Sequence, residues 1–375
     1  MTSNVITKQS FLTVAGKRFH YIWLRDNCLC PQCSHPTSFQ KLYEISDRTS
    51  PPEPLSWEEE DGELRITWNE DPPHHSRFPV SWLLSHAYDE ESEPGRTNQQ
   101  PESASQSNEI LWDKAWIEAN ISRLQEALVS DPQLWLNQLF TVGFTVLHNI
   151  ESKDLQPMLE SIGPIYSSDY GLFAPSKTTK EGKDLAETGK GMSFHTDYTY
   201  WHTPPLLTSL YCLENAASGG ESLIIDGFRV VNDFRQQHPD YFELLTQTPI
   251  QFKQVYTKWE YFYCRTQPIL ELDNSGKVTR INFANSHSYS WKLPFDQMEK
   301  FYAAYTTFFS YLKNPIYQYC FSLEPGELLL MNDSRIMHGR QPFTGNRHLE
   351  IACISWDFLQ ARQRFHQYQH LYVDR

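Results

Sequence analysis

The stretch FHTDYTYWH places His195 and Asp197 one residue apart in a run of aromatic side chains. Two side chains that share one face of a strand must stand at positions i and i+2, and these two do. Non-haem iron oxygenases hold their metal with two histidines and one carboxylate on one face of an octahedron, which leaves the other face open. The pair therefore predicts two of three iron ligands, although a lone His-x-Asp in a chain with 14 histidines is a weak signal.

The remaining ligand should come from far along the chain, and His338 in LLLMNDSRIMHGR fits because it follows a strongly apolar strand. Further on, Arg347 in NRHLE enters the last strong strand. A guanidinium fork binds a carboxylate in two places, as the distal carboxylate of 2-oxoglutarate requires. The combined pattern predicts an iron- and 2-oxoglutarate-dependent oxygenase much more specifically than the histidine and aspartate alone.

A second cluster of metal-binding residue types lies near the N-terminus, in RDNCLCPQCSHP. Seven cysteines are an odd number, and the spacing C-x-C-x2-C suits a metal better than disulfides. Structural Zn²⁺ takes four tetrahedral ligands, commonly cysteines with one histidine. The three cysteines are Cys28, Cys30 and Cys33, and the histidines that could complete the site are His74, His75 and the local His35.

The elements that must position these residues fall into two parts. Residues 1–88 read as a small β-rich module, in which residues 10–24 and 63–70 are predicted strands. Residues 89–108 contain almost no apolar side chains, which is typical of a linker. Residues 109–375 are therefore predicted to form the catalytic domain.

The catalytic part begins with helical patterns and continues as short strands. Asp131 and Pro132 suit the N-cap and first position of one helix. From about residue 190 onward, short strands such as SLIIDGF and RHLEIACISWDF alternate with turns. This density favours an antiparallel barrel or jelly roll, so we expect a mainly β protein with flanking helices.

The bulk properties narrow the function classes. The 375 residues carry a formal net charge of −14, which argues against a binder of nucleic acid or anionic membranes. No apolar run approaches the roughly 20 residues of a membrane span. The first residues, MTSNVITKQSF, lack the features of a signal or transit peptide, so a cytoplasmic protein is expected.

Several longer motifs carry a family resemblance: YIWLRDNCLCPQC, SFHTDYTYWHTPP, SGGESLIIDGF, RINFANS and MHGRQPFTGNRHLEIACISWD. They resemble the gamma-butyrobetaine hydroxylase and trimethyllysine hydroxylase branch of the taurine dioxygenase superfamily, over both parts of the chain except the linker. The resemblance implies a double-stranded β-helix and a homodimer. It also implies iron on His195, Asp197 and His338, 2-oxoglutarate on Arg347 with help from Ser222, and structural zinc on Cys28, Cys30, Cys33 and His74.

The reaction implied is oxidation of a substrate C–H bond by O2, coupled to decarboxylation of 2-oxoglutarate to succinate. The family's substrates place a trimethylammonium group among aromatic rings, whose faces attract the cation. In this chain only Tyr170 keeps its ring, because the matching positions carry Ala174, Glu187 and Cys353. Asp184 stands where the family has an asparagine.

Two interpretations of this pocket follow. Either other aromatics such as Tyr198 rebuild the cage, or the acidic Asp184 and Glu187 bind an amine that carries N–H groups. The strand RINFANS, with Arg280, Asn282 and Asn285, matches the place where the family holds the substrate carboxylate. We expect a small carboxylate-bearing amine or amino-acid derivative as substrate.

Other readings stay open at this point. Hydroxylation is the default outcome, but the same chemistry can desaturate an N-alkylated amino acid or close a ring, as in a natural-product tailoring enzyme. A gamma-butyrobetaine-type hydroxylase with a rebuilt cage is another alternative. The rival outside the enzyme class is a zinc-stabilised binding protein that has kept the fold without the activity.

Overall fold

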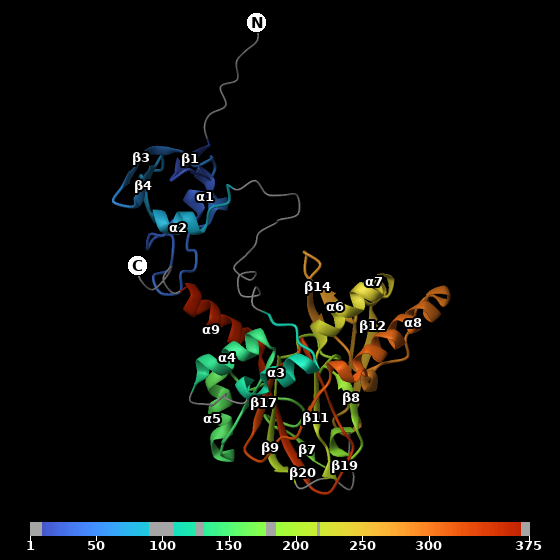
Figure 1. Cartoon of the computed structure of the whole chain (residues 1–375). Helices are drawn as coiled ribbons and strands as arrows, with labels where there is room; N and C mark the ends of the chain where they lie inside the picture. The colour runs from blue at the N-terminus through green and yellow to red at the C-terminus, as the bar shows by residue number, and fades with distance from the viewer. Residues whose placement is uncertain (1–9, 90–108, 125–130, 178–184, 216–217, 369–375) are drawn as a thin grey trace. The chain divides into compact units, whose positions relative to one another are not determined.

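The computed structural model describes residues 10–89, 109–124, 131–177, 185–215 and 218–368. The chain divides into two compact units, residues 1–99 with 364–375, and residues 100–363. Both units are visible in Figure 1, coloured along the chain from blue to red. No helix in these described ranges is long and apolar enough to cross a lipid bilayer.

The first unit is a small β-rich module built on a three-stranded antiparallel sheet in the order β3-β4-β5, beside a β1–β2 hairpin. In β4, buried Leu64, Ile66 and Trp68 alternate with more exposed residues, as a sheet with one covered face requires. The elements are β1 Phe11–Val14, β2 Lys17–His20, α1 Tyr21–Asp26, a 3-10 turn Ile45–Asp47, β3 Pro54–Glu60, β4 Glu63–Trp68, β5 His74–Pro79 and α2 Val80–Ser85.

The prediction that residues 10–24 are all strand is wrong at its end, because Tyr21–Asp26 forms helix α1. The aromatic and branched residues there read as strand by composition, yet Leu24 is fully buried in the core of the unit with Leu12 and Phe19. Tertiary packing therefore decided between two local conformations of similar propensity.

The second unit is mostly β, with helices around two antiparallel sheets. Its strands are β6 Phe144–Leu147, β7 Ala174–Lys177, β8 Met192–His195, β9 Leu206–Asn215, β10 Ser218–Gly219, β11 Ser222–Asp226, β12 Ile250–Tyr256, β13 Tyr261–Gln267, β14 Leu270–Leu272, β15 Val278–Ile281, β16 Tyr319–Phe321, β17 Leu328–Asn332, β18 Ile336–Arg340, β19 Phe343–Thr344 and β20 Arg347–Ser355. Its helices are α3 Lys114–Leu124, α4 Pro132–Thr141, α5 Ser152–Ile162, α6 Gly227–Gln237, α7 Pro239–Gln247, α8 Phe295–Leu312 and the first part, up to residue 363, of α9 Trp356–Tyr368. Short 3-10 turns are Leu185–Glu187, Thr257–Trp259, Asn285–His287 and Pro315–Tyr317.

The two sheets have the strand orders β16-β11-β18-β8 and β6-β17-β9-β20-β7. Neighbours in these lists are far apart in sequence, so the sheets are formed by long-range pairing, as in a jelly roll. The predicted cap of α4 is confirmed, because the side chain of Asp131 accepts a hydrogen bond from the backbone N–H of Leu134 at 3.1 Å.

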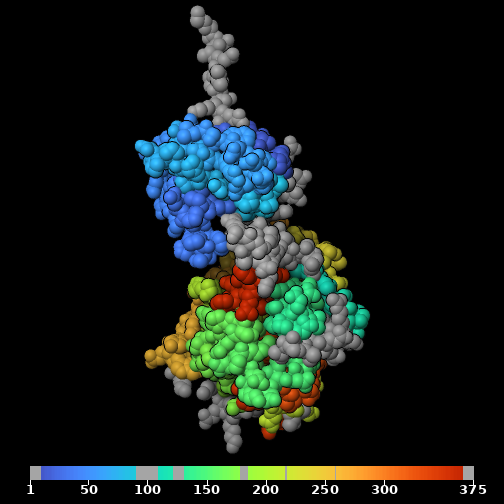
Figure 2. Space-filling model, turned by 90° about the vertical axis from the view of Figure 1, so that its left-hand side faces the viewer, coloured from blue at the N-terminus to red at the C-terminus, as the bar shows by residue number. Residues whose placement is uncertain are grey.

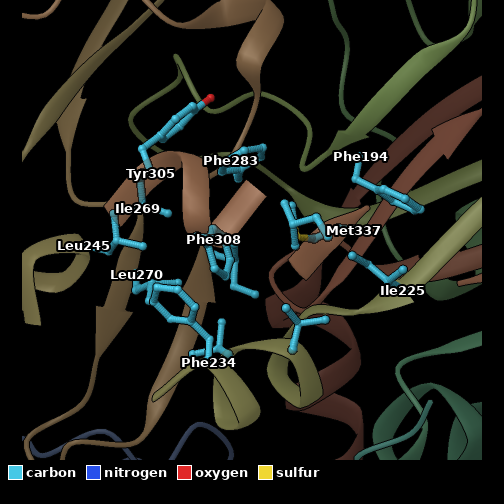
Figure 3. Close-up of a cluster of buried hydrophobic side chains, with 14 of the residues drawn as sticks. Phe194, Ile225, Phe234, Leu245, Ile269, Leu270, Phe283, Tyr305, Phe308 and Met337 are labelled. Carbon is cyan, nitrogen blue, oxygen red and sulfur yellow. The ribbon is translucent and has the colours of Figure 1, made fainter. Parts of the chain in front are cut away.

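Helices cover the outer sides of the sheets. Met337 of β18 lies between Phe194 of β8 and Ile225 of β11 (Figure 3), and the same buried cluster includes Phe234 of α6 and Phe308 of α8. These helices therefore bury the back of the β8–β18 sheet and fix the strands whose other faces carry the site. The green part of the chain, which includes α4 and α5, lies at the surface of this unit in Figure 2.

Candidate active site

Three potential metal ligands meet where β8 and β18 pair. His195 ends β8, and its backbone pairs with that of His338 in β18. The Oδ1 atom of Asp197 lies 3.5 Å from Nε2 of His195 and 3.6 Å from Nε2 of His338. The two imidazole centroids are 4.2 Å apart, so all three ligand atoms face one point. Two histidines and one carboxylate in this arrangement fit a non-haem iron site.

Hydrogen bonds orient the ligands. Nδ1 of His195 donates to the backbone carbonyl of Ser193 at 2.9 Å, which leaves Nε2 directed into the site. Behind His338 lies the carboxyl group of Asp333, with Oδ1 3.7 Å from Nδ1 of His338. Both atoms are buried and lack a hydrogen-bond partner among the described residues.

Burial and charge shift the pKa values at this point. Burial would raise the pKa of Asp197, but the adjacent His338 and His195 hold it below its ordinary value. Burial, followed by the influence of His195, lowers the pKa of His338 to about 4. Burial and the nearby charge of Asp197 raise the pKa of Asp333 well above its usual range. Asp197 and Asp333 therefore repel each other when both are ionised. A bound cation would reduce this repulsion.

The ligands open onto a cavity of about 330 Å³ between the two sheets. One wall comes from β8, β11 and β18, and the facing wall comes from β7, β9 and β20. The residues of these strands in the lining are Ala174, Pro175, Ser176, Met192, His195, Leu210, Ser222, His338, Gly339, Arg340, Arg347, Leu349 and Ile351. The distant strands of the jelly roll thus bring the predicted iron ligands and the predicted cosubstrate-binding arginine to one space.

Arg347 begins β20 and reaches this cavity as a buried cation, with 6% of its surface exposed. Its Nη1 atom is buried and has no hydrogen-bond partner among the described residues. Burial lowers its pKa, an effect that Cys212 partly offsets. Gly220 allows the close approach, because a Cβ there would lie 3.0 Å from Cδ of Arg347. The guanidinium lies over the ring of Phe343, 5.6 Å from its centroid, and an unsatisfied Nη1 in a lining that also contains the hydroxyl of Ser222 fits an anionic ligand such as a carboxylate.

A second buried arginine, Arg340, fastens the segment that follows β7. Its guanidinium donates to the backbone carbonyls of Thr188 and Lys190 at 2.7 and 2.8 Å. Further bonds reach the carbonyls of Leu185 and Ala186 at 3.3 and 3.2 Å. Because Arg340 stands two residues after His338 in β18, it ties this part of the cavity wall to the strand that carries a metal ligand.

The predicted substrate residues are placed unevenly. Tyr170 and Tyr198 line the cavity, and Asp184 lies outside the described residues. The residues that are not part of the lining are Glu187, Arg280, Asn282, Asn285 and Cys353.

For Asn282 and Asn285, hydrogen bonds to other parts of the protein explain why they do not line the cavity. The amide of the buried Asn282 donates to Glu271 at 2.8 Å, and the carbonyl of the exposed Asn285 accepts from Tyr305 at 2.9 Å, so both amides have partners within the protein. Alignment by residue count could not reveal these partners.

The structure also places in the lining polar residues that the sequence motifs did not indicate, Ser168, Asp169, Gln254, Tyr256 and His287, together with Tyr200 of the FHTDYTYWH stretch and Ser286 of the RINFANS stretch. They come from the turn before β7, the segment after β8, strand β12 and the turn after β15. No spacing rule connects these segments, because the tertiary fold alone brings them together. The only local indication of Asp169 in the sequence was its position beside Tyr170, a predicted substrate residue.

The cysteine cluster of the first unit is also a compact group. Nε2 of His74 lies 3.3 Å from Sγ of Cys28, 3.7 Å from Sγ of Cys30 and 3.5 Å from Sγ of Cys33. Zinc with tetrahedral bonds of about 2.3 Å to sulfur and 2.0 Å to nitrogen requires about 3.5 Å between these atoms. His75 is the next residue of β5, and its Nδ1 is 3.1 Å from the hydroxyl of Thr67 instead.

His35, the local alternative, accepts hydrogen bonds from backbone N–H groups of its own turn and is not part of the cluster. Arg25 supports the cluster from behind: Nη1 lies 3.4 Å from Sγ of Cys33, and the guanidinium also forms a two-point contact with Glu70. Burial raises the pKa of Cys33, and the cation of Arg25 beside the sulfur opposes this effect by favouring the thiolate, the form that binds metal.

Comparisons with known proteins agree with this geometry. A family model described as taurine catabolism dioxygenase TauD, TfdA family matches residues 105–353. A model described as gamma-butyrobetaine hydroxylase-like, N-terminal matches residues 10–84. Among solved structures, asparagine oxygenase in complex with Fe(II), 2S,3S-3-hydroxyasparagine and succinate shares the fold, with a TM-score of 0.50 and 14% identity over 65% of this chain and 84% of that chain.

Curated relatives extend along nearly the whole chain. Gamma-butyrobetaine dioxygenase of Pseudomonas sp. (strain AK-1) is 29% identical, with 92% of this chain and 89% of the relative covered. Trimethyllysine dioxygenase of Meyerozyma guilliermondii is 27% identical, with 93% of this chain and 90% of the relative covered. The family model spans well over half of the residues, and the chain therefore belongs to the TauD, TfdA family of dioxygenases, oxidoreductases that use iron and 2-oxoglutarate.

Proposed function

We propose that His195, Asp197 and His338 hold Fe(II), and that Arg347 and Ser222 hold the distal carboxylate of 2-oxoglutarate. The observation that carries this proposal is the meeting of a three-ligand cluster and an orphaned buried guanidinium in one cavity. Bound iron with 2-oxoglutarate and O2 supplies the capacity to oxidise an unactivated C–H bond, with release of succinate and CO2.

The residues of this chain position the metal and the cosubstrate and exclude water from the cavity. Ser193 keeps Nε2 of His195 directed at the metal position. Arg347 holds the cosubstrate from the opposite end of the same cavity, beside the apolar Leu210, Leu349 and Ile351, which limit water there. The substrate then occupies the rest of the cavity, so the walls choose which C–H bond faces the iron.

The substrate in this proposal is a small carboxylate-bearing amine or amino-acid derivative. The named activities of the relatives support it, since gamma-butyrobetaine and trimethyllysine are both small molecules that carry a carboxylate and a cationic nitrogen. A cavity of about 330 Å³ that also holds 2-oxoglutarate leaves room for a molecule of this size but not for a polymer.

The first unit in this proposal is a structural zinc module, with Cys28, Cys30, Cys33 and His74 as ligands. The distances from Nε2 of His74 to the three sulfurs support tetrahedral coordination. Four protein ligands leave no open position, so the metal stabilises the unit and takes no part in the oxidation.

The deciding experiment is O2-dependent succinate release by the purified chain with Fe(II), 2-oxoglutarate and a panel of amino acids, betaines and N-alkylated amino acids. We expect at least one compound to stimulate succinate formation, and His338→Ala to abolish it. A parent protein that binds neither Fe(II) nor 2-oxoglutarate would instead be the non-catalytic binding protein considered above.

A further inference from the structure

The cavity continues beyond the metal ligands into an end that carries one more acidic side chain. Besides Asp197, Asp169 is the only carboxylate among the described lining residues. It sits in a tight turn, in which the backbone N–H groups of Ser168 and Gly171 donate to each other's carbonyls at 2.8 and 2.9 Å. The turn fixes the direction of the carboxylate through the backbone.

Tyr263 holds Asp169 by its side chain as well. The phenol of Tyr263 donates to Oδ1 of Asp169 at 2.9 Å. Burial, followed by this hydrogen bond, raises the pKa of Tyr263 to about 12, so the phenol remains a donor at neutral pH. No described lysine, arginine or histidine forms an ion pair with Asp169. One oxygen of the carboxylate is thus held, while its charge has no cationic partner among the described side chains.

Several aromatic rings belong to the same part of the molecule as this acidic group. Tyr170 and Tyr256 both line the cavity, and their rings stand at 86° with centroids 6.2 Å apart. Trp259 closes the corner, 5.7 Å from Tyr170 and 5.3 Å from Tyr256. Tyr200 adds another wall and lies 5.8 Å from the ring of Tyr263. Ring faces and a carboxylate both attract cations, and phenol oxygens also accept hydrogen bonds.

We propose that Asp169, together with Tyr170 and Tyr256, binds the protonated amine of the substrate, and that this amine carries at least one N–H. This assignment rests on the proposed function and names the substrate class more closely. A charge-assisted hydrogen bond to a carboxylate requires an N–H, which a quaternary ammonium lacks. Other polar groups in the lining of the same cavity, on Gln254, Ser286 and His287, suit the substrate carboxylate.

The position differs from the one that the sequence motifs suggested. Glu187 is buried, with 6% of its surface exposed, and it is not part of the cavity lining. Glu187→Gln is therefore a matched control for Asp169→Asn, because both changes neutralise a carboxylate and keep its shape. Tyr263→Phe is a milder second variant, since it leaves the charge of Asp169 in place and removes only the hydrogen bond that holds it.

The test uses two series of compounds, gamma-aminobutyrate and lysine, each as the free amine and with one, two or three methyl groups on the terminal nitrogen. Binding is measured by calorimetry without O2, in the full chain loaded with Fe(II) and 2-oxoglutarate, and succinate release is measured separately. We expect an N–H-bearing form to bind best in at least one series. Asp169→Asn should weaken that binding by about tenfold or more, Tyr263→Phe by less, and Glu187→Gln should leave it unchanged.

Consumption of 2-oxoglutarate without any added amine distinguishes a failure of the amine-binding assignment from a failure of the proposed function. If Asp169→Asn keeps this consumption and loses only amine binding, the assignment holds. Tightest binding of the trimethylated forms, binding unaffected by Asp169→Asn, or no binding by either series would overturn the assignment while leaving the proposed function intact. Absence of 2-oxoglutarate binding in the parent protein would instead overturn the proposed function.

Discussion

Asp333 accepts a hydrogen bond from the backbone N–H of Asp197 at 2.8 Å, although the two residues are 136 positions apart in the chain. The other oxygen of the same carboxyl group faces Nδ1 of His338 at 3.7 Å. A single buried side chain thus contacts the backbone of one proposed iron ligand and lies behind the ring of another. Such outer groups orient metal ligands and tune their basicity.

We therefore expect Asp333→Ala to lower the affinity for Fe(II) by about 10- to 100-fold, as is typical when an outer partner of a metal ligand is removed. Asp333→Asn keeps a carbonyl oxygen for the N–H of Asp197, so its loss should be smaller. Anaerobic Fe(II) titration of the three proteins measures the difference. Equal affinities in all three would show that Asp333 does not position the ligands.

His338→Ala should abolish succinate release while leaving the thermal unfolding temperature close to that of the parent, because the side chain faces the cavity and not the packed core. The matched control is His348→Ala, which removes an imidazole from β20 outside the cavity lining. Metal analysis after anaerobic loading should show iron in the control and in the parent. Full activity of His338→Ala would refute the ligand assignment.

Arg347→Ala should weaken 2-oxoglutarate binding by about 2 kcal/mol, roughly thirtyfold in Kd, since a charged two-point hydrogen bond is lost. Arg347→Lys keeps a positive charge but not the fork, so its affinity should fall between the other two. Calorimetric titration with 2-oxoglutarate under anaerobic conditions provides the three values. Unchanged affinity in Arg347→Ala would mean that another cation holds the cosubstrate.

Zinc should remain with the protein after iron is removed by a mild chelator, since the first unit offers four ligands and the iron site offers three. Cys30→Ser should lose this zinc and unfold at lower temperature. Cys320→Ser, which changes an exposed cysteine, should do neither. Zinc retained in Cys30→Ser but lost in a His75→Ala variant would move the site away from His74.

The sequence predicted those parts of the site whose residues follow a local rule. The i and i+2 spacing of His195 and Asp197 results from strand geometry, and His338 was recognisable because an apolar strand precedes it. The cysteine cluster proposed to bind zinc was likewise visible from cysteine spacing, while the proposal of His74 rather than His75 depends on which face of β5 each side chain occupies.

The amine-binding end of the cavity follows no such rule. Asp169 and Tyr256 lie on separate segments, and only the paired strands and their connecting turns bring them to one cavity. Glu187 was predicted as a substrate residue from its separation from His195 along the chain. That separation does not determine the direction in which a side chain points. Arg280 is an instructive case: it stands on the expected strand β15, yet its side chain does not enter the lining.

The five hydrogen bonds from Arg340 to Ser176 and to the carbonyls of residues 185–190 have a consequence for local opening. Carbonyls that share one buried cation cannot be released one at a time without leaving that cation partly unsatisfied. The backbone amides of this segment should therefore exchange their hydrogens for deuterium as one cooperative group rather than fraying from one end. Because this segment forms part of the cavity wall, ligands that fill the cavity would slow the exchange along the whole segment, and the exchange rate would report occupancy.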